Sequence, residues 1–278
     1  MLPNESTVQR NERLFRCESP VVMVTGSAAP RVGRRVIETF LSEKFRVVIH
    51  SHHADKAAQQ ALDELTAAGH TAMLITGAVE DEAAVTGWVE QTFERFGRID
   101  VLVCSAAIWD PYPLEKTRTA DYERFFRVNS LGTALCGQHF GLAMAKQASG
   151  GAIVNIGDWA MARPYRDFLP YLISKGTIEC CTRSLAVELA HRNPLVRVNA
   201  VMPGPIQLAS GISPERQAKI VQASLLKRAG TPDDLAQAVL FLATSPFITG
   251  VCLPVDGGRT IWSGDSTDVS AHPDCEQG

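Results

Sequence analysis

Short apolar runs alternate with longer amphipathic stretches along most of this 278-residue chain. Several of the runs are continuously apolar and rich in β-branched residues, which is typical of parallel strands covered on both faces. The stretches between them carry apolar residues at helical spacing, as at Val32, Val36 and Phe40. The runs that predict strands are 21–25, 46–51, 71–76, 100–105, 151–157, 196–202 and 250–256.

This order of elements predicts one α/β domain. A strand followed by a helix, repeated about six times, favours a single doubly wound parallel sheet of about seven strands with helices on both faces. No internal domain boundary is visible, and we expect the folded domain to span residues 20–262. The polar segments 1–19 and 263–278 are interpreted as N-terminal and C-terminal tails.

Composition narrows the classes of partner. Hydrophobic residues make up 45% of the chain, and its net charge of −3 comes from interspersed acidic and basic residues. This balance favours neither nucleic acid nor a membrane surface, so we expect a small-molecule ligand. The seven cysteines are scattered without a C-x-x-C pair, which predicts reduced thiols, a cytoplasmic location and no zinc site. No apolar run is long enough for a membrane span, and the first residues lack the apolar centre of a signal peptide.

A glycine-containing loop follows the first predicted strand. Gly26 and Gly33 lie between that strand and a helix pattern, where glycines let backbone amides approach a pyrophosphate and the helix N-terminus adds partial positive charge. Arg31 and Arg34 lie near the expected phosphates. The loop predicts a dinucleotide site, and a plain glycine turn is the alternative.

The end of the second predicted strand indicates which dinucleotide binds. NAD sites usually have an acidic residue there, which accepts from the ribose 2′-hydroxyl. Here Ser51, His52 and His53 occupy that place, and Arg31 is close enough in the fold to meet a 2′-phosphate. NADP(H) is therefore favoured over NAD(H). A metal site at these histidines is the alternative, but no further ligand spacing completes it.

A Y-x-x-x-K pair lies in a long helical pattern. Tyr171 and Lys175 are four residues apart, so both side chains lie on one helix face. A nearby ammonium favours phenolate, and we expect it to lower the tyrosine pKa from about 10. Tyr171 then becomes a usable acid at neutral pH.

With these motifs, the chain resembles the short-chain dehydrogenase/reductase family over about residues 20–262. The resemblance rests on Thr25-Gly26, Asn129 in RVNSLGT, Tyr171 with Lys175, PGP at 203–205 and VDGG at 255–258. It implies a Rossmann-like fold, NAD(P)-dependent hydride transfer and a homo-tetramer or dimer.

The resemblance also implies roles for individual residues. Tyr171 would be the proton donor, Lys175 would bind the nicotinamide ribose and tune the tyrosine, and Asn129 would hold a proton-relay water. The residues expected to bind the cofactor are Gly26, Arg31, Val32, Gly33, Ser51, His52, His53, Ser105, Ala106, Tyr171, Lys175, Pro203, Gly204 and Ile206.

The chain departs from the family pattern at several positions. Its glycine loop is one residue longer than the usual T-G-x-x-x-G-x-G, and the family's N-N-A-G is here the segment 104–107, CSAA. Ala78 stands where an aspartate often meets the adenine. The largest departure is Asp158, thirteen residues before Tyr171, where the family usually has serine.

A carboxylate at residue 158 changes the expected chemistry. Serine donates to a carbonyl oxygen that gains negative charge, whereas an ionised Asp158 would repel that charge by about 1–4 kcal/mol at about 4 Å. A C=N bond reverses the preference, because its nitrogen must gain a proton. Asp158 therefore joins Tyr171, Lys175 and Asn129 as a candidate catalytic residue, and a helix cap is the alternative.

Within the family, the chain looks most like the pteridine reductases. The shared features are Arg31, the His-rich segment 50–53 and the segment SAAIWDPYPLEKT. In that branch an aromatic residue of this segment stacks the pterin against the nicotinamide, and the matching residue here is Trp109. We expect Trp109, Asp158 and Tyr171 to bind the substrate, and the alternative for Trp109 is the core or a subunit interface.

Three functions remain open at this point. The first is an NADPH-dependent reductase of a pterin-like or other cyclic C=N substrate. The second is a short-chain reductase of a carbonyl substrate, such as a 3-oxoacyl thioester, a sugar or another ketone. The third is a catalytically silent NADP-binding sensor, which the altered glycine loop favours and the retained Tyr171 and Lys175 disfavour.

Overall fold

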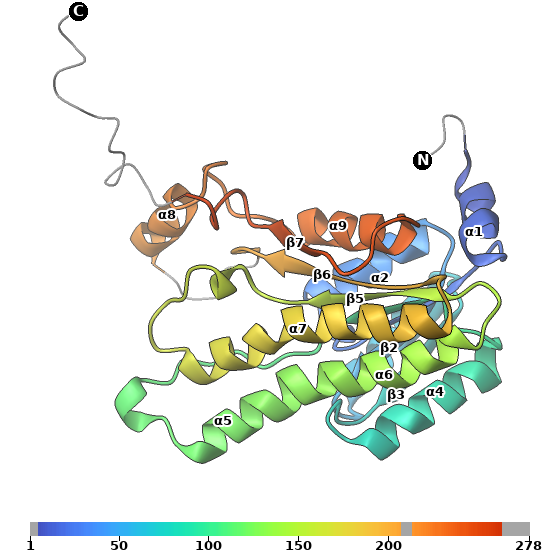
Figure 1. Ribbon diagram of the computed structural model, residues 1–278, viewed down its shortest axis with the longest axis horizontal. Coiled ribbons are helices and arrows are strands. Elements are labelled where there is room, and N and C mark those ends of the chain that lie inside the picture. Colours follow the sequence, from blue (N-terminus) through green and yellow to red (C-terminus); the bar gives the residue numbers. More distant parts are fainter. Residues whose placement is uncertain (1–4, 207–212, 263–278) are drawn as a thin grey trace, which may run out of the picture.

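The computed structural model describes residues 5–206 and 213–262, which form a seven-stranded parallel sheet between two layers of helices (Figure 1). The strand order is β3-β2-β1-β4-β5-β6-β7. This arrangement confirms the predicted fold class. The strands are β1 (Val21–Val24), β2 (Arg46–Ser51), β3 (Ala72–Thr76), β4 (Val101–Cys104), β5 (Gly151–Ile156), β6 (Val196–Pro203) and β7 (Cys252–Val255).

The α-helices connect these strands and cover both faces of the sheet. The α-helices of the described residues are α1 (Thr7–Phe15), α2 (Val32–Ser42), α3 (Lys56–Ala67), α4 (Glu82–Phe96), α5 (Thr119–Phe125), α6 (Gly132–Ala145), α7 (Leu169–Arg192), α8 (Pro214–Gln222) and α9 (Pro232–Thr244). Three shorter helical segments accompany them: η1 (Leu114–Lys116), η2 (Phe126–Leu131, a π-helix) and η3 (Trp159–Met161).

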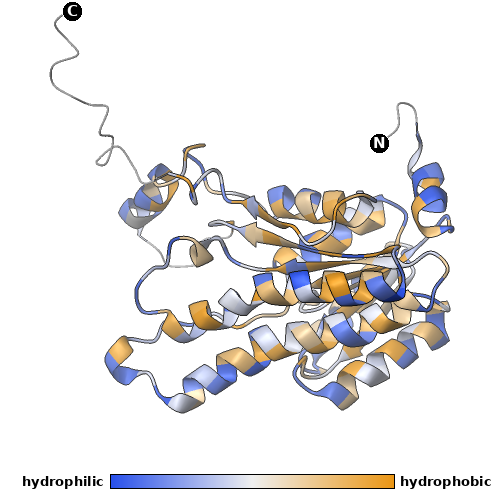
Figure 2. Ribbon diagram, in the orientation of Figure 1, coloured by the Kyte–Doolittle hydropathy of each residue, from blue (hydrophilic) through white to orange (hydrophobic). Residues whose placement is uncertain are grey.

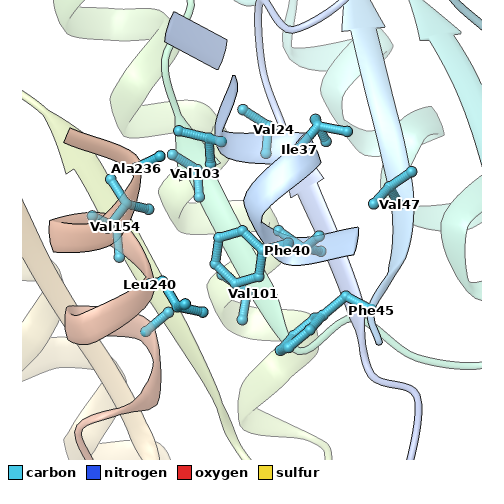
Figure 3. Close-up of a cluster of buried hydrophobic side chains, with 14 of the residues drawn as sticks. Val24, Ile37, Phe40, Phe45, Val47, Val101, Val103, Val154, Ala236 and Leu240 are labelled. Atoms are coloured by element: carbon cyan, nitrogen blue, oxygen red, sulfur yellow. The ribbon is translucent and has the colours of Figure 1, made fainter. Parts of the chain in front are cut away.

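Alternating side chains of the strands build two cores. Val22 and Val24 of β1 pack with α2, α3 and α9, and Figure 3 shows Val24 together with Ile37 and Phe40 of α2. Val21 and Met23 point to the opposite face and join the cluster that contains side chains of α4, α6 and α7. All four β1 residues are buried, since both faces of the strand are covered. This burial accounts for the continuously apolar runs.

The N-terminal segment differs from the predicted polar tail. Residues 7–15 form α1, which begins with a capping box at Ser6 and ends in the buried Phe15. The Asn11 side chain donates to the carbonyl oxygens of Glu18 and Glu43, at 3.2 and 3.0 Å. The prediction of a tail through residue 19 is therefore wrong for α1, because polar contacts to the domain hold a helix that has few apolar residues. The predicted tail 263–278 lies outside the described residues.

The sheet order places a crevice at the ends of β1 and β4. The chain leaves β1 toward β2 on one side of the sheet, while β4 pairs with β1 on the other. Ligands of open α/β sheets bind at such a switch point, outside the carboxyl ends of the strands. None of the helices in the described ranges is long and apolar enough to span a membrane.

Candidate active site

The loops after β1 and β4 are in close contact at the crevice. Gly26 has a φ of +68°, and a Cβ there would lie 2.9 Å from the Cα of Ala106. Thr25 Oγ1 accepts hydrogen bonds from the backbone N–H groups of Ser105 and Ala106, at 2.9 and 3.0 Å. Only glycine suits residue 26, because the backbone is left-handed and the neighbouring chain leaves no room.

His50, at the end of β2, connects this loop to the end of β3. The backbone N–H of Gly26 donates to His50 Nδ1 at 2.9 Å, and His50 Nε2 lies 3.0 Å from the carbonyl oxygen of Gly77. These partners require the neutral tautomer with hydrogen on Nε2. Burial lowers the pKa of His50 to about 4, so the ring stays neutral near pH 7. Sequence reasoning missed this role, although a histidine within a buried strand was a usable signal.

A cavity of about 650 Å³ lies over these loops. Gly33 is at the start of α2, and a Cβ there would lie 2.8 Å from the carbonyl oxygen of Gly26. A narrow glycine surface beside a helix N-terminus fits the pyrophosphate of a dinucleotide. Seven of the predicted cofactor residues line this cavity: Gly26, Arg31, Val32, Gly33, His52, Ser105 and Ala106.

Ser51 and His53, which were also predicted near the ribose, do not line this cavity. Ser51 lines a neighbouring hollow together with Arg34. Arg34 is engaged in ion pairs with Glu38 and Glu64, both at 3.4 Å. His53 is exposed and packs edge-on against His52, with ring centroids 4.2 Å apart. Arg31 is exposed and forms no ion pair within the described residues.

A second cavity, of about 660 Å³, continues from the first at Val32, Ser105 and Ala107. It is formed by the end of β5, the first turns of α7 and the segments after β4 and β6. It brings together most of the remaining predicted site residues: Trp109, Asp158, Tyr171, Lys175, Pro203, Gly204 and Ile206. The geometry thus brings most of the predicted catalytic and cofactor residues into one continuous crevice, whereas Asn129, Ser51 and His53 do not line it.

Asp158 makes two hydrogen bonds at the floor of this cavity. Its Oδ1 accepts from the backbone N–H of Ala160 at 2.8 Å and caps η3. Its Oδ2 accepts from the hydroxyl of Tyr171 at 2.5 Å. The sequence left two roles open for Asp158, a helix cap and a catalytic residue. The structure is compatible with both, because the same carboxylate caps η3 and contacts the candidate catalytic tyrosine.

The surroundings of Tyr171 shift its pKa in the direction opposite to the one expected from the sequence. Burial and the Asp158 carboxylate hold the pKa of Tyr171 well above its usual value, so the expected lowering by Lys175 is wrong for this state. Lys175 Nζ instead donates to the carbonyl oxygen of Ile156 at 2.7 Å, and burial lowers the Lys175 pKa to about 8. Burial also raises the pKa of Asp158. The phenol and the carboxylate therefore share a proton that stays on the pair near neutral pH.

Asn129 is fully buried in η2, beneath the second cavity. Its Oδ1 accepts from the N–H of Ile108 at 2.9 Å, and its Nδ2 donates to the carbonyl oxygen of Ile108 and to Ser174 Oγ. These bonds fasten the segment that contains Trp109 to α7. Asn129 is thus a positioning residue in this structure, and its role toward a relay water stays a prediction.

Trp109 lies at the mouth of the second cavity. It is 48% exposed and stacks on Phe168 with ring centroids 4.7 Å apart and an interplanar angle of 22°. Its Nε1 donates to the hydroxyl of Tyr165 at 3.1 Å. The exposure excludes the core alternative, whereas the role in substrate binding stays a prediction. Phe168 and Tyr165 were missed, because their segment has no recognisable motif.

Comparison with known proteins identifies the family. Residues 28–260 match the family model described as Enoyl-(Acyl carrier protein) reductase, adh_short_C2. The chain belongs to the short-chain dehydrogenase/reductase family. The crystal structure of gox2181 superposes on this short-chain dehydrogenase/reductase with a TM-score of 0.81 and 28% identity, covering 88% of this chain and 96% of that one.

Two curated members of the family are similar over almost their whole length. The (2S)-[(R)-hydroxy(phenyl)methyl]succinyl-CoA dehydrogenase subunit BbsD of Thauera aromatica is 34% identical, over 89% of this chain and 99% of that protein. The cis-4-hydroxycyclohexanecarboxylate dehydrogenase of Sinomonas cyclohexanicum is 33% identical, over 86% and 96%. This short-chain dehydrogenase/reductase is accordingly an oxidoreductase of a family that uses NAD(P). The relatives named here are dehydrogenases rather than pteridine reductases.

Proposed function

We propose that the protein is an NADP(H)-dependent dehydrogenase that oxidises a secondary hydroxyl group and, in reverse, reduces the corresponding carbonyl. The observation that carries this proposal is the hydrogen bond between Tyr171 and Asp158 within the second cavity. When bound, the nicotinamide cofactor accepts or returns the hydride. The chain's own residues then have to move one proton and orient the carbon that reacts.

The Tyr171–Asp158 pair suits removal of a hydroxyl proton. A substrate hydroxyl that donates to Tyr171 Oη can pass its proton to the phenol while the phenol proton moves to Asp158 Oδ2. An ionised Asp158 therefore assists oxidation, although it would repel a carbonyl oxygen that gains charge. The reverse direction begins with Asp158 protonated, and burial favours that form by raising its pKa.

Reduction of a C=N bond is the second candidate. It is favoured by the carboxylate of Asp158, since a serine hydroxyl at this place could not supply a proton to nitrogen as readily. Support for it is weaker, because the two relatives are named for substrates that contain a hydroxyl group. The silent-sensor hypothesis is disfavoured by membership in a family of enzymes.

The preference for NADP(H) is part of the proposal. Arg31 and His52 line the cofactor cavity, and Arg31 has no ion-pair partner within the described ranges. A 2′-phosphate would pair with this cation, whereas the usual acceptor for a 2′-hydroxyl is absent from the end of β2. Discrimination between NADPH and NADH should therefore depend on Arg31 and His52.

We also infer a homo-tetramer or dimer. Ile173, Cys180 and Val187 are exposed and lie seven residues apart, so they share one face of α7. This helix lies beside α6 in front of the sheet in Figure 1, and Figure 2 shows hydrophobic residues interspersed with hydrophilic ones along it. Such an apolar stripe is typical of a helix that packs against a second subunit. Light scattering on the purified protein tests the assembly.

The decisive experiment compares substrate classes. NADP⁺ reduction would be followed with ring hydroxy acids, sugars and 3-hydroxyacyl thioesters, and NADPH oxidation with their ketones, dihydropterin and cyclic imines. Hydroxyl or ketone turnover that falls about 10²- to 10⁴-fold in Tyr171→Phe supports the proposal. Turnover of imines or pterins alone would transfer the assignment to the second candidate.

A further inference from the structure

Two arginines face the second cavity without an anionic partner. Arg166 and Arg259 both line it, on the side of Trp159 and Phe168. Neither guanidinium group forms an ion pair with any residue in 5–206 or 213–262. Several other arginines of this domain, such as Arg228 with Asp234 at 2.7 Å, are paired with carboxylates.

Arg259 is held in place but is incompletely bonded. Its Nη1 donates to the carbonyl oxygen of Ile220 at 2.7 Å, and its guanidinium carbon lies 4.5 Å from the centre of the Trp159 ring. Its Nε is buried and has no hydrogen-bond partner. Burial and the positive charge of Arg163 lower the pKa of Arg259, and the negative charge of Asp256 offsets this lowering only in part. A buried donor on a cation is costly when it has no acceptor.

None of the nearby carboxylates forms an ion pair with Arg259 within the described residues. Asp256 Oδ1 and Oδ2 accept from the backbone N–H groups of Gly258 and Thr260, at 2.9 and 2.6 Å. Asp158 is engaged with Tyr171 and Ala160. Asp167, the remaining carboxylate of the cavity wall, forms no ion pair within the described part of the chain. Within residues 5–206 and 213–262, therefore, no carboxylate forms an ion pair with Arg259, and its guanidinium group can pair with an anionic ligand in the cavity.

We propose that Arg259, with Arg166, forms a carboxylate-binding subsite, so that the substrate is a ring-bearing hydroxy acid. Arginine binds a carboxylate with paired, charge-assisted hydrogen bonds. The faces of Trp159, Trp109 and Phe168 supply an apolar wall for the ring between the carboxylate and the reacting hydroxyl. The substrate class rests on the proposed function, whereas binding of the carboxylate does not.

The test separates binding from catalysis with two ligands that cannot react. Cyclohexanecarboxylate and its neutral carboxamide would be titrated by calorimetry into the protein saturated with NADP⁺. We expect the acid to bind at least about tenfold more tightly than the amide in the wild type. Arg259→Gln should abolish this preference, and Arg259→Lys should restore part of it.

Arg166→Gln provides a second variant in case Arg259→Gln does not fold, because the Arg166 side chain is exposed. It should weaken binding of the acid about threefold or more and leave the amide unchanged. Arg127→Gln is the matched control: Arg127 is exposed, forms no ion pair within the described residues and lies outside the cavity. The Arg127→Gln variant should prefer the acid over the amide as strongly as the wild type does.

Three outcomes overturn the subsite. The first is equal binding of acid and amide to the wild type, and the second is an acid preference that survives in both Arg259→Gln and Arg166→Gln. The third is a loss of NADPH affinity in Arg259→Gln with the acid preference intact, because the anion would then be a cofactor phosphate. If the acid preference holds but no hydroxyl or ketone is turned over, the subsite stands and the proposed function fails.

Discussion

Replacing Asp158 by asparagine should slow oxidation of a hydroxyl substrate more than it weakens substrate binding. The amide oxygen of asparagine can still accept from the N–H of Ala160 and cap η3. It cannot take up the Tyr171 proton that Oδ2 now accepts at 2.5 Å. The perturbation therefore removes the charge and the proton acceptor while it keeps the local backbone.

The size of the effect follows from the bond that is lost. A hydrogen bond to a charged group contributes about 1.5–3 kcal/mol, and each 1.36 kcal/mol changes a rate tenfold. We expect kcat for oxidation to fall about 10- to 150-fold. KM should change by less than about threefold, since the substrate contacts in the ground state remain.

The pH profile gives an independent measurement. In the wild type, the oxidation rate should fall as the pH drops through the raised pKa of Asp158, because the protonated carboxyl cannot accept a proton. In Asp158→Asn this acidic limb should disappear. Initial rates of NADP⁺ reduction from pH 4.5 to about 9 would show both effects.

Two control variants make the reasoning refutable. Asp167→Asn removes another carboxylate of the same cavity and should leave kcat within about threefold of the wild type. Asp158→Ser, which introduces the family's usual hydroxyl, should retain more ketone reduction than Asp158→Asn. Wild-type oxidation kinetics in Asp158→Asn, with the acidic limb unchanged, would show that Asp158 is only a cap.

Three further perturbations test other parts of the crevice. The pKa of His50, lowered to about 4 from 6.5, implies stability that is complete above pH 6.5 and lost as the pH falls toward 4. The loss should reach about 3 kcal/mol in urea unfolding and should be absent in His50→Gln. Arg31→Glu should weaken NADPH binding about tenfold or more and leave NADH binding within about threefold, which fluorescence titration measures. Equal losses for both cofactors would contradict a 2′-phosphate contact. Gly26→Ala should weaken both cofactors together, because its Cβ would lie 2.9 Å from Ala106; unchanged affinity would refute the tight approach.

The strands were predictable because strands buried on both faces have short, continuously apolar sequences. The run 46–51 coincides with β2, and the other six predicted strands lie within a few residues of the observed ones. Helix α1 was not predictable by the same means. Its stability depends on Phe15 and on the Asn11 contacts to Glu18 and Glu43, which join residues up to 32 positions apart.

The candidate catalytic residues Tyr171, Lys175 and Asp158 could be proposed from the sequence. Helix spacing places Tyr171 and Lys175 on one face, and Asp158 occupies the place, thirteen residues before Tyr171, where the family that the chain resembles usually has serine. His50, Arg166 and Arg259 were missed as site residues, because no local pattern connects them to the crevice. Arg259, for example, lines the same cavity as Asp158 although 101 positions separate the two residues in the chain. Only the folded sheet brings such residues to one place.

The hydrogen bond between Tyr171 and Asp158 changes the reasoning by which the sequence favoured a C=N substrate. An isolated carboxylate beside a carbonyl oxygen is repulsive, and that interaction alone disfavours a ketone. In the fold, however, Oδ2 faces the phenol proton, so the carboxylate acts on the substrate through Tyr171. The same negative charge then opposes reduction when it is ionised and assists oxidation when it accepts the phenol proton. Because burial raises the pKa of Asp158, the pH can select between these two states, and the direction of catalysis should depend on pH more steeply than in an Asp158→Ser variant.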